Sequence, residues 1–407
     1  MPRYRLAYLV THSIQYQAPL LRTIAAEPDL DLRVFFCSDF SVGEFTDPNF
    51  GVPVTWDVPL LEGYRYEFLP SLAATRQPSF WRPLNYGLAK RLRKERFDLL
   101  WVHGWGNNVA NTFAPLLARR LGLPVLMRTE NCAVGTRRRD DLIQSLREVL
   151  KRRIIDACDV FGYIGRANRD YLLSYGVPAE HLFSMPYAVD NVQFRKRATE
   201  ARPKRAAFRQ SLRIEEGRPV ILWVGKIYEL KRLADMLAAY HKLSPDGREE
   251  PLPYLLIVGE GPERTELEAA AGNTGWQSIK FIGFVNQGDL LAYYDLADVL
   301  VISSRMEQWG IVVNEAMNCG CAIVASDRVG CAADLVCNGE NGYVFPALDS
   351  DALAACLKKI FAEPDRLAQM QVESLRIIES YSYDQDVIGL REAIDYLVRS
   401  SKVRLLA

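Results

Sequence analysis

Short apolar runs alternate with stretches of helical character along almost the whole chain. Runs of this kind are typical of strands buried on both faces of a parallel sheet. Because a helical stretch follows most of them, the rhythm predicts βαβ units with right-handed crossovers, and therefore an α/β fold. The predicted strands cover residues 6–10, 32–37, 99–102, 125–128, 160–164, 220–224, 254–258, 280–282, 299–302, 322–325 and 343–345.

The length and the spacing of these runs indicate two domains. A chain of 407 residues is too long for one ordinary hydrophobic core. The stretch 191–215 has mixed charge and few periodic apolar residues, which suits a linker. We therefore expect domains over 1–190 and 216–380 and a final segment over 381–407. Residues 40–82, rich in Pro, Gly and aromatic side chains, are expected to form a long irregular excursion.

Composition argues against several classes of protein. Fifty basic residues balance fifty acidic ones, so no global field favours nucleic acid. Eight cysteines without CxxC pairs and four scattered histidines form no metal-ligand pattern. We therefore expect no metal and no cofactor, and reduced thiols in a cytoplasmic protein.

The chain shows no expected membrane span. The first apolar run is short and meets His12 at once, so it is interpreted as a strand and not as a signal peptide. No apolar stretch reaches the length that a transmembrane helix needs. Basic runs at 90–94, 137–139 and 151–153 are either solvated helix faces or a surface for a membrane or an anionic acceptor. Peripheral contact with the cytoplasmic membrane face therefore stays open.

Two glutamates bracket a glycine turn between two predicted strands. Glu307 follows the run 299–302, Gly310 comes next, and Glu315 falls on the helix-forming stretch before 322–325. The carboxyl ends of parallel strands are where open α/β sheets bind ligands. The pair is therefore a candidate binding site, although an arbitrary glutamate pair is more often solvated surface.

Ordered motifs in the second half resemble the retaining glycosyltransferases of family 4, also called glycosyl transferases group 1. They are Val224-Gly225-Lys226 to Lys231, Leu256 to Pro262, Phe281 to Val285, Glu307 to Glu315, and Gly339 to Phe345. The first half is similar to the family's variable acceptor domain through 11–19 and 102–105. This resemblance implies the GT-B fold, with two Rossmann-like domains facing a central cleft. It also implies that a last helix, expected at 386–398, crosses back to the first domain.

The resemblance implies a nucleotide-sugar site in the second domain. Lys226 and Lys231 would bind the diphosphate. The family usually has Arg at the position of Lys226, and Lys keeps the charge but cannot form the bidentate hydrogen bonds of a guanidinium. Glu315 would accept bonds from the ribose hydroxyls, and Glu307 would lie by the sugar ring as a catalytic residue. Trp309 replaces a frequent Phe, and packing is the favoured interpretation. The remaining predicted donor contacts are Gly225, Gly261, Phe284, Val285, Gly310, Ile311 and Val312.

The first domain would supply the acceptor side. His103 ends a predicted strand and, by resemblance, faces the donor sugar, so it is the second catalytic candidate. Weaker acceptor-side candidates are His12, Gln15, Arg128 and Glu130.

The implied activity is transfer of a sugar from a nucleotide-diphosphate sugar to a saccharide or lipid-linked saccharide acceptor. Retention, metal independence and a role in cell-surface polysaccharide or lipopolysaccharide synthesis follow from the same resemblance. A nucleotide-sugar 2-epimerase and a catalytically silent GT-B binding subunit remain as alternatives. A phosphorylase shares the two-domain plan, but the chain shows no pyridoxal-lysine motif.

Overall fold

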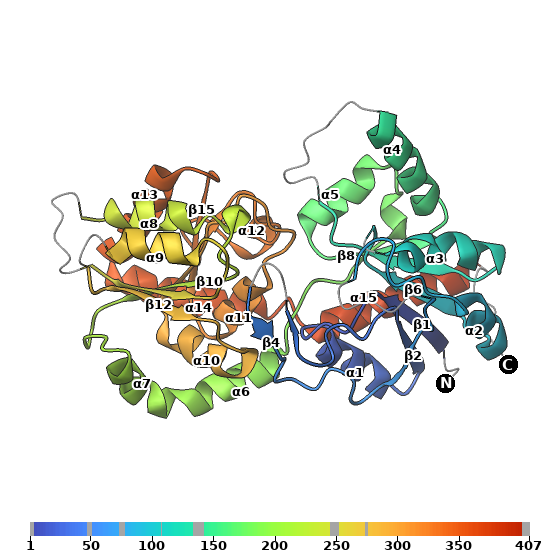
Figure 1. The fold of residues 1–407 in the computed structure, drawn as a ribbon, viewed down its shortest axis with the longest axis horizontal. Helices are drawn as coiled ribbons and strands as arrows, with labels where there is room; N and C mark the ends of the chain where they lie inside the picture. The colour runs from blue at the N-terminus through green and yellow to red at the C-terminus, as the bar shows by residue number, and fades with distance from the viewer. Residues whose placement is uncertain are drawn as a thin grey trace. The chain divides into compact units, whose positions relative to one another are not determined.

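The structure is a computed structural model, and it describes residues 4–46, 51–72, 78–106, 108–132, 142–244, 252–272 and 276–400. The chain divides into two compact units (Figure 1). Unit 1 consists of Met1–Phe45, Val58–Tyr187 and Tyr383–Ala407, and unit 2 of Thr46–Asp57 and Ala188–Ser382.

Unit 1 is built on a seven-stranded parallel sheet in the order β5-β2-β1-β6-β7-β8-β9. Chain order reverses between β1 and β6, whose register pairs Leu6 with Leu99. The reversal leaves a crevice beyond the carboxyl ends of these two strands, where open α/β sheets bind ligands. The strands are β1 (Tyr4–Val10), β2 (Leu30–Phe36), β5 (Arg65–Phe68), β6 (Leu99–His103), β7 (Val125–Arg128), β8 (Val160–Tyr163) and β9 (Leu182–Ser184).

Helices cover this sheet, and the last one of the chain belongs to the same unit. That helix, α15, contacts β8 and β9. Gly389 lets it lie directly on the sheet, since a Cβ there would collide with the carbonyl oxygen of Ser184. The helices of unit 1 are α1 (Ala18–Ala26), α2 (Leu88–Glu95), α3 (Val109–Arg120), α4 (Leu142–Ile155), α5 (Arg166–Ser174), η1 (Ala179–His181) and α15 (Tyr383–Arg399).

Unit 2 has a six-stranded parallel sheet in the order β12-β11-β10-β13-β14-β15. This is the doubly wound order, and here the reversal lies between β10 and β13. Its strands are mostly apolar, and the four inner ones are almost wholly buried, as expected of a sheet covered on both faces. They are β10 (Val220–Val224), β11 (Tyr254–Val258), β12 (Ile279–Gly283), β13 (Val299–Ile302), β14 (Ala322–Ser326) and β15 (Gly342–Phe345).

The helices α8, α9 and α13 lie on one face of this sheet, and α10, α11 and α14 on the other (Figure 1). The short strands β3 (Phe45–Thr46) and β4 (Pro53–Val54) pair with each other. No helix among the described residues is both long and apolar enough to cross a membrane. The helices of unit 2 are α6 (Asn191–Ala201), η2 (Arg202–Lys204), α7 (Arg205–Ser211), η3 (Glu229–Lys231), α8 (Leu233–His241), α9 (Arg264–Gly272), α10 (Gln287–Leu296), α11 (Ile311–Asn318), α12 (Ala332–Leu335), α13 (Ser350–Ala362) and α14 (Pro364–Ile378).

The predicted fold class is confirmed, since both sheets are parallel and covered by helices. Every apolar run expected to be a strand forms one. The structure differs in three stretches, and the first is the short strand β9 (Leu182–Ser184), which was not predicted. The excursion 40–82 contains the edge strand β5, and the expected linker 191–215 folds as α6, η2 and α7, which contact α10. Asp190 begins α6, because its side chain accepts a hydrogen bond from the backbone of Gln193 at 2.9 Å.

The contact of α15 with β9 gives a stability prediction. Gly389→Ala should destabilise unit 1 by about 1–3 kcal/mol, because the added methyl meets backbone that cannot move aside cheaply. A control is Gly272→Ala at the end of α9, where nothing lies within 4 Å of the new Cβ. Thermal melting followed by circular dichroism measures both. Equal melting temperatures for the two variants would contradict the close packing of α15.

Candidate functional site

In unit 2 the loops after β10 and β11 touch each other through their backbones. The amide of Gly225 donates to Val258 O at 3.0 Å, and that of Ile227 donates to Glu260 O at 2.7 Å. A Cβ at Gly259 would collide with the carbonyl oxygen of Gly225, and one at Gly261 with that of Ile227. Two predicted donor contacts lie in these loops. Gly225 belongs to the loop after β10, and Gly261 lets the loop after β11 pack directly against it.

The loop after β10 carries both predicted lysines. Lys226 is half-buried at its start, and Lys231 ends the turn η3. The hydroxyl of Ser303, just beyond β13, lies 3.0 Å from the carbonyl oxygen of Lys231. Ser303 also accepts a 3.1 Å hydrogen bond from the indole of Trp223. Strand β13 therefore fixes the backbone from which the Lys231 side chain extends.

The structure brings Lys231 and Glu307 into direct contact. The ammonium group of Lys231 donates to Oε2 of Glu307, and the two side chains keep 20% and 21% of their surface exposed. The backbone of Glu307 is held in turn, because its amide donates to Arg328 O at 3.0 Å and its carbonyl accepts from Gly330 N at 2.9 Å. The pair is thus fixed at its base but remains accessible to a ligand.

Helix α11 begins directly beyond this pair. Gly310 precedes it with φ of +95°, a left-handed conformation that favours glycine. Ile311 and Val312 form the first turn, so their amides lie at the positive end of the helix. Trp309 is buried, and its indole donates to Asn314 at 2.8 Å, which agrees with the packing interpretation.

Glu315 lies on the buried side of α11, with 5% of its surface exposed. Its carboxylate accepts hydrogen bonds from the Tyr294 hydroxyl at 2.7 Å and from the Gln287 amide at 3.4 Å. Burial raises the pKa of Glu315 to about 7. The loop that carries Phe284 and Val285 leads directly into Gln287, the first residue of α10. The side chain of Gln287 connects this loop to Glu315.

In unit 1 the end of β6 holds a buried histidine. Nε2 of His103 lies 2.5 Å from the Gln17 amide nitrogen and 3.2 Å from the Tyr187 hydroxyl. Gln17 is oriented by Tyr8, whose hydroxyl donates to its Oε1 at 3.1 Å. Gln17 and Tyr187 therefore both hold the Nε2 edge of the ring in the interior of unit 1. Burial lowers the pKa of His103, so the neutral form dominates near pH 7.

Glu130 follows β7 and belongs to the same hydrogen-bonded cluster. Its Oε1 accepts from the hydroxyls of Tyr16, at 3.2 Å, and of Tyr187. Burial by itself raises the pKa of Glu130, but the neighbouring His103 and the two tyrosines outweigh it, so the pKa is lowered. Glu130 is therefore a carboxylate near neutral pH, with 29% of its side chain exposed.

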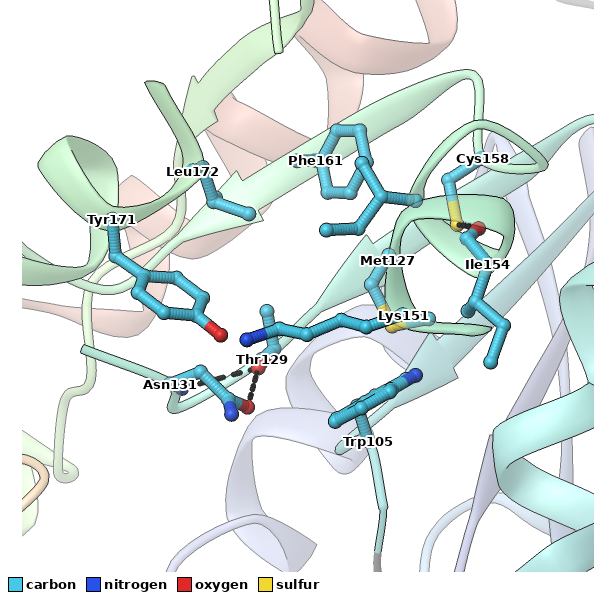
Figure 2. A pocket seen from close by; sticks show the side chains of 11 residues that line it. Trp105, Met127, Thr129, Asn131, Lys151, Ile154, Cys158, Phe161, Tyr171 and Leu172 are labelled. Atoms are coloured by element: carbon cyan, nitrogen blue, oxygen red, sulfur yellow. Dashed lines mark hydrogen bonds between the residues drawn. The ribbon is translucent and has the colours of Figure 1, made fainter. Parts of the chain in front are cut away.

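A pocket lies beside this cluster in unit 1 (Figure 2). It encloses about 310 Å³, part of it open to solvent. Lys151 extends into it and donates to the Tyr175 hydroxyl at 2.7 Å, with its ammonium 4.4 Å from the ring centre of Tyr171. The lining residues are Trp105, Met127, Thr129, Asn131, Lys151, Ile154, Ile155, Cys158, Phe161, Tyr171 and Leu172.

Arg128, predicted on the acceptor side, has a structural role instead. Its side chain is 1% exposed and forms a 2.8 Å ion pair with Asp386 of α15. It also donates to the carbonyl oxygens of Met185 and Pro186 at 2.9 and 3.0 Å. We therefore correct this assignment, because a guanidinium enclosed by its own fold cannot reach an acceptor.

The other two acceptor-side candidates lie near the end of β1. His12 is half-buried, with Nδ1 at 3.0 Å from the Thr11 hydroxyl, and burial lowers its pKa. Gln15 is half-buried in the turn before α1. The contact with His103 comes from Gln17, two residues further along. Gln17 and Tyr16 are in the quoted motif 11–19, but nothing in their spacing indicated which side chain turns inward.

The described residues contain no group of three or more His, Cys, Asp or Glu side chains that could hold a metal ion.

Comparison with protein families assigns the two halves of the chain. Residues 16–188 match the family model described as "Glycosyl transferase 4-like domain", and residues 204–374 match "Glycosyl transferases group 1". The chain belongs to the group 1 glycosyltransferases. The resemblance stated from the motifs is thereby confirmed, and the enzyme class is a glycosyltransferase of the GT-B type.

Curated relatives of this glycosyltransferase are distant. Alpha-D-kanosaminyltransferase of Streptomyces kanamyceticus is 26% identical over 306 residues, which is 74% of this chain and 77% of that protein. D-inositol 3-phosphate glycosyltransferase 2 of Catenulispora acidiphila is 29% identical over 289 residues, 67% of this chain and 64% of its own length. Other matches span about half of the relative, such as 48% for the enzyme of Rhodococcus erythropolis.

Solved structures show the same fold. The sucrose-phosphate synthase of Thermosynechococcus elongatus superposes with a TM-score of 0.69 at 19% identity, covering 98% of this chain and 100% of that one. HepE of Anabaena, solved with UDP, gives a TM-score of 0.70 at 16% identity, covering 96% and 99%.

The buried carboxyl group of the glycosyltransferase gives a pH prediction. Between the ordinary value of 4.5 and about 7, the folded protein keeps a proton on Glu315 that the unfolded chain has lost. The stability contributed by this group therefore declines as pH rises through that range. The Glu315→Gln variant lacks this decline. The melting temperature of the variant minus that of wild type should therefore increase from about pH 5 to about pH 8.

The full effect corresponds to about 3 kcal/mol. Glu266→Gln, an exposed position on α9, serves as the control and should show no such trend. A constant difference between Glu315→Gln and wild type across this range would show that Glu315 titrates normally.

Proposed function

We propose that this glycosyltransferase moves a sugar from a nucleotide-diphosphate sugar to an acceptor hydroxyl, with retention of anomeric configuration and without a metal ion. One observation carries the proposal. At the carboxyl end of the unit 2 sheet, a cation and a carboxylate, Lys231 and Glu307, are held in contact beside the N-terminus of α11.

The diphosphate would bind to charges that the loop after β10 supplies. Lys226 and Lys231 offer two ammonium groups, and the amides of Ile311 and Val312 offer the positive end of α11. Such donors can neutralise a departing phosphate in the role that a divalent cation has elsewhere. This arrangement supports metal independence.

The nucleoside would bind at Glu315. Its carboxylate accepts two hydrogen bonds from protein groups and has further lone pairs for the vicinal ribose hydroxyls. Phe284 and Val285 lie on the loop that leads into Gln287, so they are the proposed contacts to the base. HepE was solved with UDP, and a UDP-sugar is therefore the first donor to test.

Transfer would proceed on the front face of the sugar. The acceptor oxygen bonds to the anomeric carbon on the side from which the diphosphate leaves, and the leaving phosphate oxygen takes the acceptor proton. Glu307 would stabilise the positive charge that develops on the ring. His103, neutral near pH 7 and held by Gln17, is proposed as the residue at the end of β6 that faces the donor sugar.

The acceptor would bind in unit 1. Glu130 presents a partly exposed carboxylate, and the neighbouring residue Thr129 lines the pocket that also holds Trp105. A cyclic acceptor with several hydroxyls suits a carboxylate that can accept hydrogen bonds from it. His12 and Gln15 stay proposed as weaker contacts.

Two relatives are named for an aminocyclitol and an inositol phosphate, which favours acceptors of that kind in a first screen. Synthesis of a cell-surface polysaccharide or lipopolysaccharide, by a cytoplasmic enzyme, is the proposed pathway.

Removing one cation tests the donor site. Lys231→Ala should weaken donor binding and lower kcat/KM by about 10- to 100-fold, because one charge-assisted bond to the diphosphate is lost. Lys242→Ala is the matched control, since Lys242 forms an ion pair with Asp351 in the same unit and is assigned no ligand. Calorimetric titration with donor and a coupled release assay measure the two effects. Equal loss in both variants, or in neither, would refute this site.

The stereochemical course is tested separately. The anomeric proton of the product, followed by NMR, should show the configuration of the donor, and excess EDTA should leave the initial rate unchanged. Inversion would refute the front-face mechanism, and an EDTA-sensitive rate would refute metal independence. Conversion of the donor with no acceptor present would favour an epimerase, and failure to bind any nucleotide sugar would favour a silent binding subunit.

A further inference from the structure

Large apolar side chains are exposed on one connected segment of unit 1. Between β5 and α2, residues 70–72 run antiparallel beside 84–86, and the described residues 70–72 and 78–86 together are called the hairpin. Four of its side chains are exposed, with the fraction of surface accessible being 77% for Leu72, 67% for Trp81, 40% for Leu84 and 53% for Tyr86. Single exposed apolar residues are common, but a cluster of this size on one segment indicates a binding surface.

Backbone pairing turns three of these side chains, those of Leu72, Leu84 and Tyr86, to the same side. Ser71 and Asn85 form an antiparallel bridge, and the amide of Leu72 donates to Leu84 O at 3.0 Å. Asn85 points inward, since its side-chain amide donates to the carbonyl oxygens of Cys37 and Leu69 at 2.8 and 3.1 Å. Because side chains alternate along paired strands, Leu84 and its partner Leu72 point outward, and so does Tyr86.

Exposed cations follow this hairpin along the chain. The chain passes from Tyr86 straight into α2 (labelled in Figure 1), which buries Leu88 and Leu92 and exposes Lys90, Arg93 and Lys94. Arg82 and Arg96 are exposed as well. Over residues 70–96 the sequence contains a single acidic residue, Glu95, which lies 3.7 Å from Arg33. The segment therefore joins exposed apolar side chains with an excess of positive charge in its sequence.

We propose that this surface, formed by Leu72, Trp81, Leu84, Tyr86, Lys90, Arg93 and Lys94, docks on an anionic lipid bilayer. Trp and Tyr side chains favour the boundary between headgroups and acyl chains, and Leu side chains enter the apolar layer. Exposed lysines and arginines are attracted to anionic headgroups. Charge complementarity selects lipid over a second copy of this chain, because two copies would bring these cations against one another.

Sedimentation with vesicles tests the proposal without donor or acceptor, so its outcome does not depend on the proposed transfer reaction. The full chain is mixed with vesicles of phosphatidylcholine alone, or of phosphatidylcholine with phosphatidylglycerol. Wild type should bind only the anionic vesicles, and less in higher salt. Two variants remove the two contributions, namely Trp81→Ser with Tyr86→Ser, and Lys90→Gln with Arg93→Gln and Lys94→Gln. Each should lower the partition coefficient about tenfold or more.

Two controls separate this surface from exposed apolar residues in general. Leu146→Ser with Val149→Ser alters α4, whose exposed apolar residues also lie among arginines, and Val192→Ser with Val372→Ser alters unit 2. Both controls should bind vesicles as wild type does, and melting temperatures confirm that all variants are folded. Several results would overturn the proposal: wild type that ignores anionic vesicles, hairpin variants that still bind, loss of binding in the α4 variant, or wild-type self-association that the hairpin variants abolish.

Discussion

The candidate site in unit 2 depends on a close approach between the two loops that leave β10 and β11. Their backbones meet at Gly225 and Gly259, where a Cβ on Gly259 would collide with the carbonyl oxygen of Gly225. This contact fixes the start of the loop that carries both lysines, and Ser303 fixes its end. The backbone that carries Lys231 and the backbone that carries Glu307 are therefore both held by hydrogen bonds. For this reason the two charged side chains can meet at a partly exposed position.

Unit 1 contains both an enclosed charge pair and a partly exposed carboxylate. In unit 1, Arg128 and Asp386 are almost fully enclosed, and their pairing joins α15 to the sheet. Removing either partner would leave an uncompensated charge in a low-dielectric interior. Glu130, two residues after Arg128, keeps part of its surface exposed. Two tyrosine hydroxyls donate hydrogen bonds to one of its carboxylate oxygens. Two positions at the end of β7, two residues apart, thus differ: Arg128 is enclosed by packing, and Glu130 keeps a partly exposed carboxylate.

Patterns that depend on local sequence were predictable, and contacts between distant residues were not. Apolar runs located the strands because burial on both faces leaves an unmistakable signature. The motif around Glu307 and Lys231 placed both residues at strand ends of one sheet, where the structure brings them together. Strand β5 was missed because it is an exposed edge with no apolar run. Arg128 looked like a site residue, since only Asp386, far along the chain, reveals that it is paired. Tyr187 was missed for the same reason, because its partner His103 is 84 residues away.

The environment of Glu315 has a consequence for heat measurements on this enzyme. A carboxyl group that titrates near neutrality is a mixture of two forms in ordinary buffers. Hydroxyl donors from a ribose would favour the ionised form, so binding would expel a fraction of a proton into solution. The buffer would absorb that proton with its own ionisation enthalpy. Observed binding heats should then differ between phosphate and Tris at the same pH, and the slope against buffer enthalpy would count the protons released.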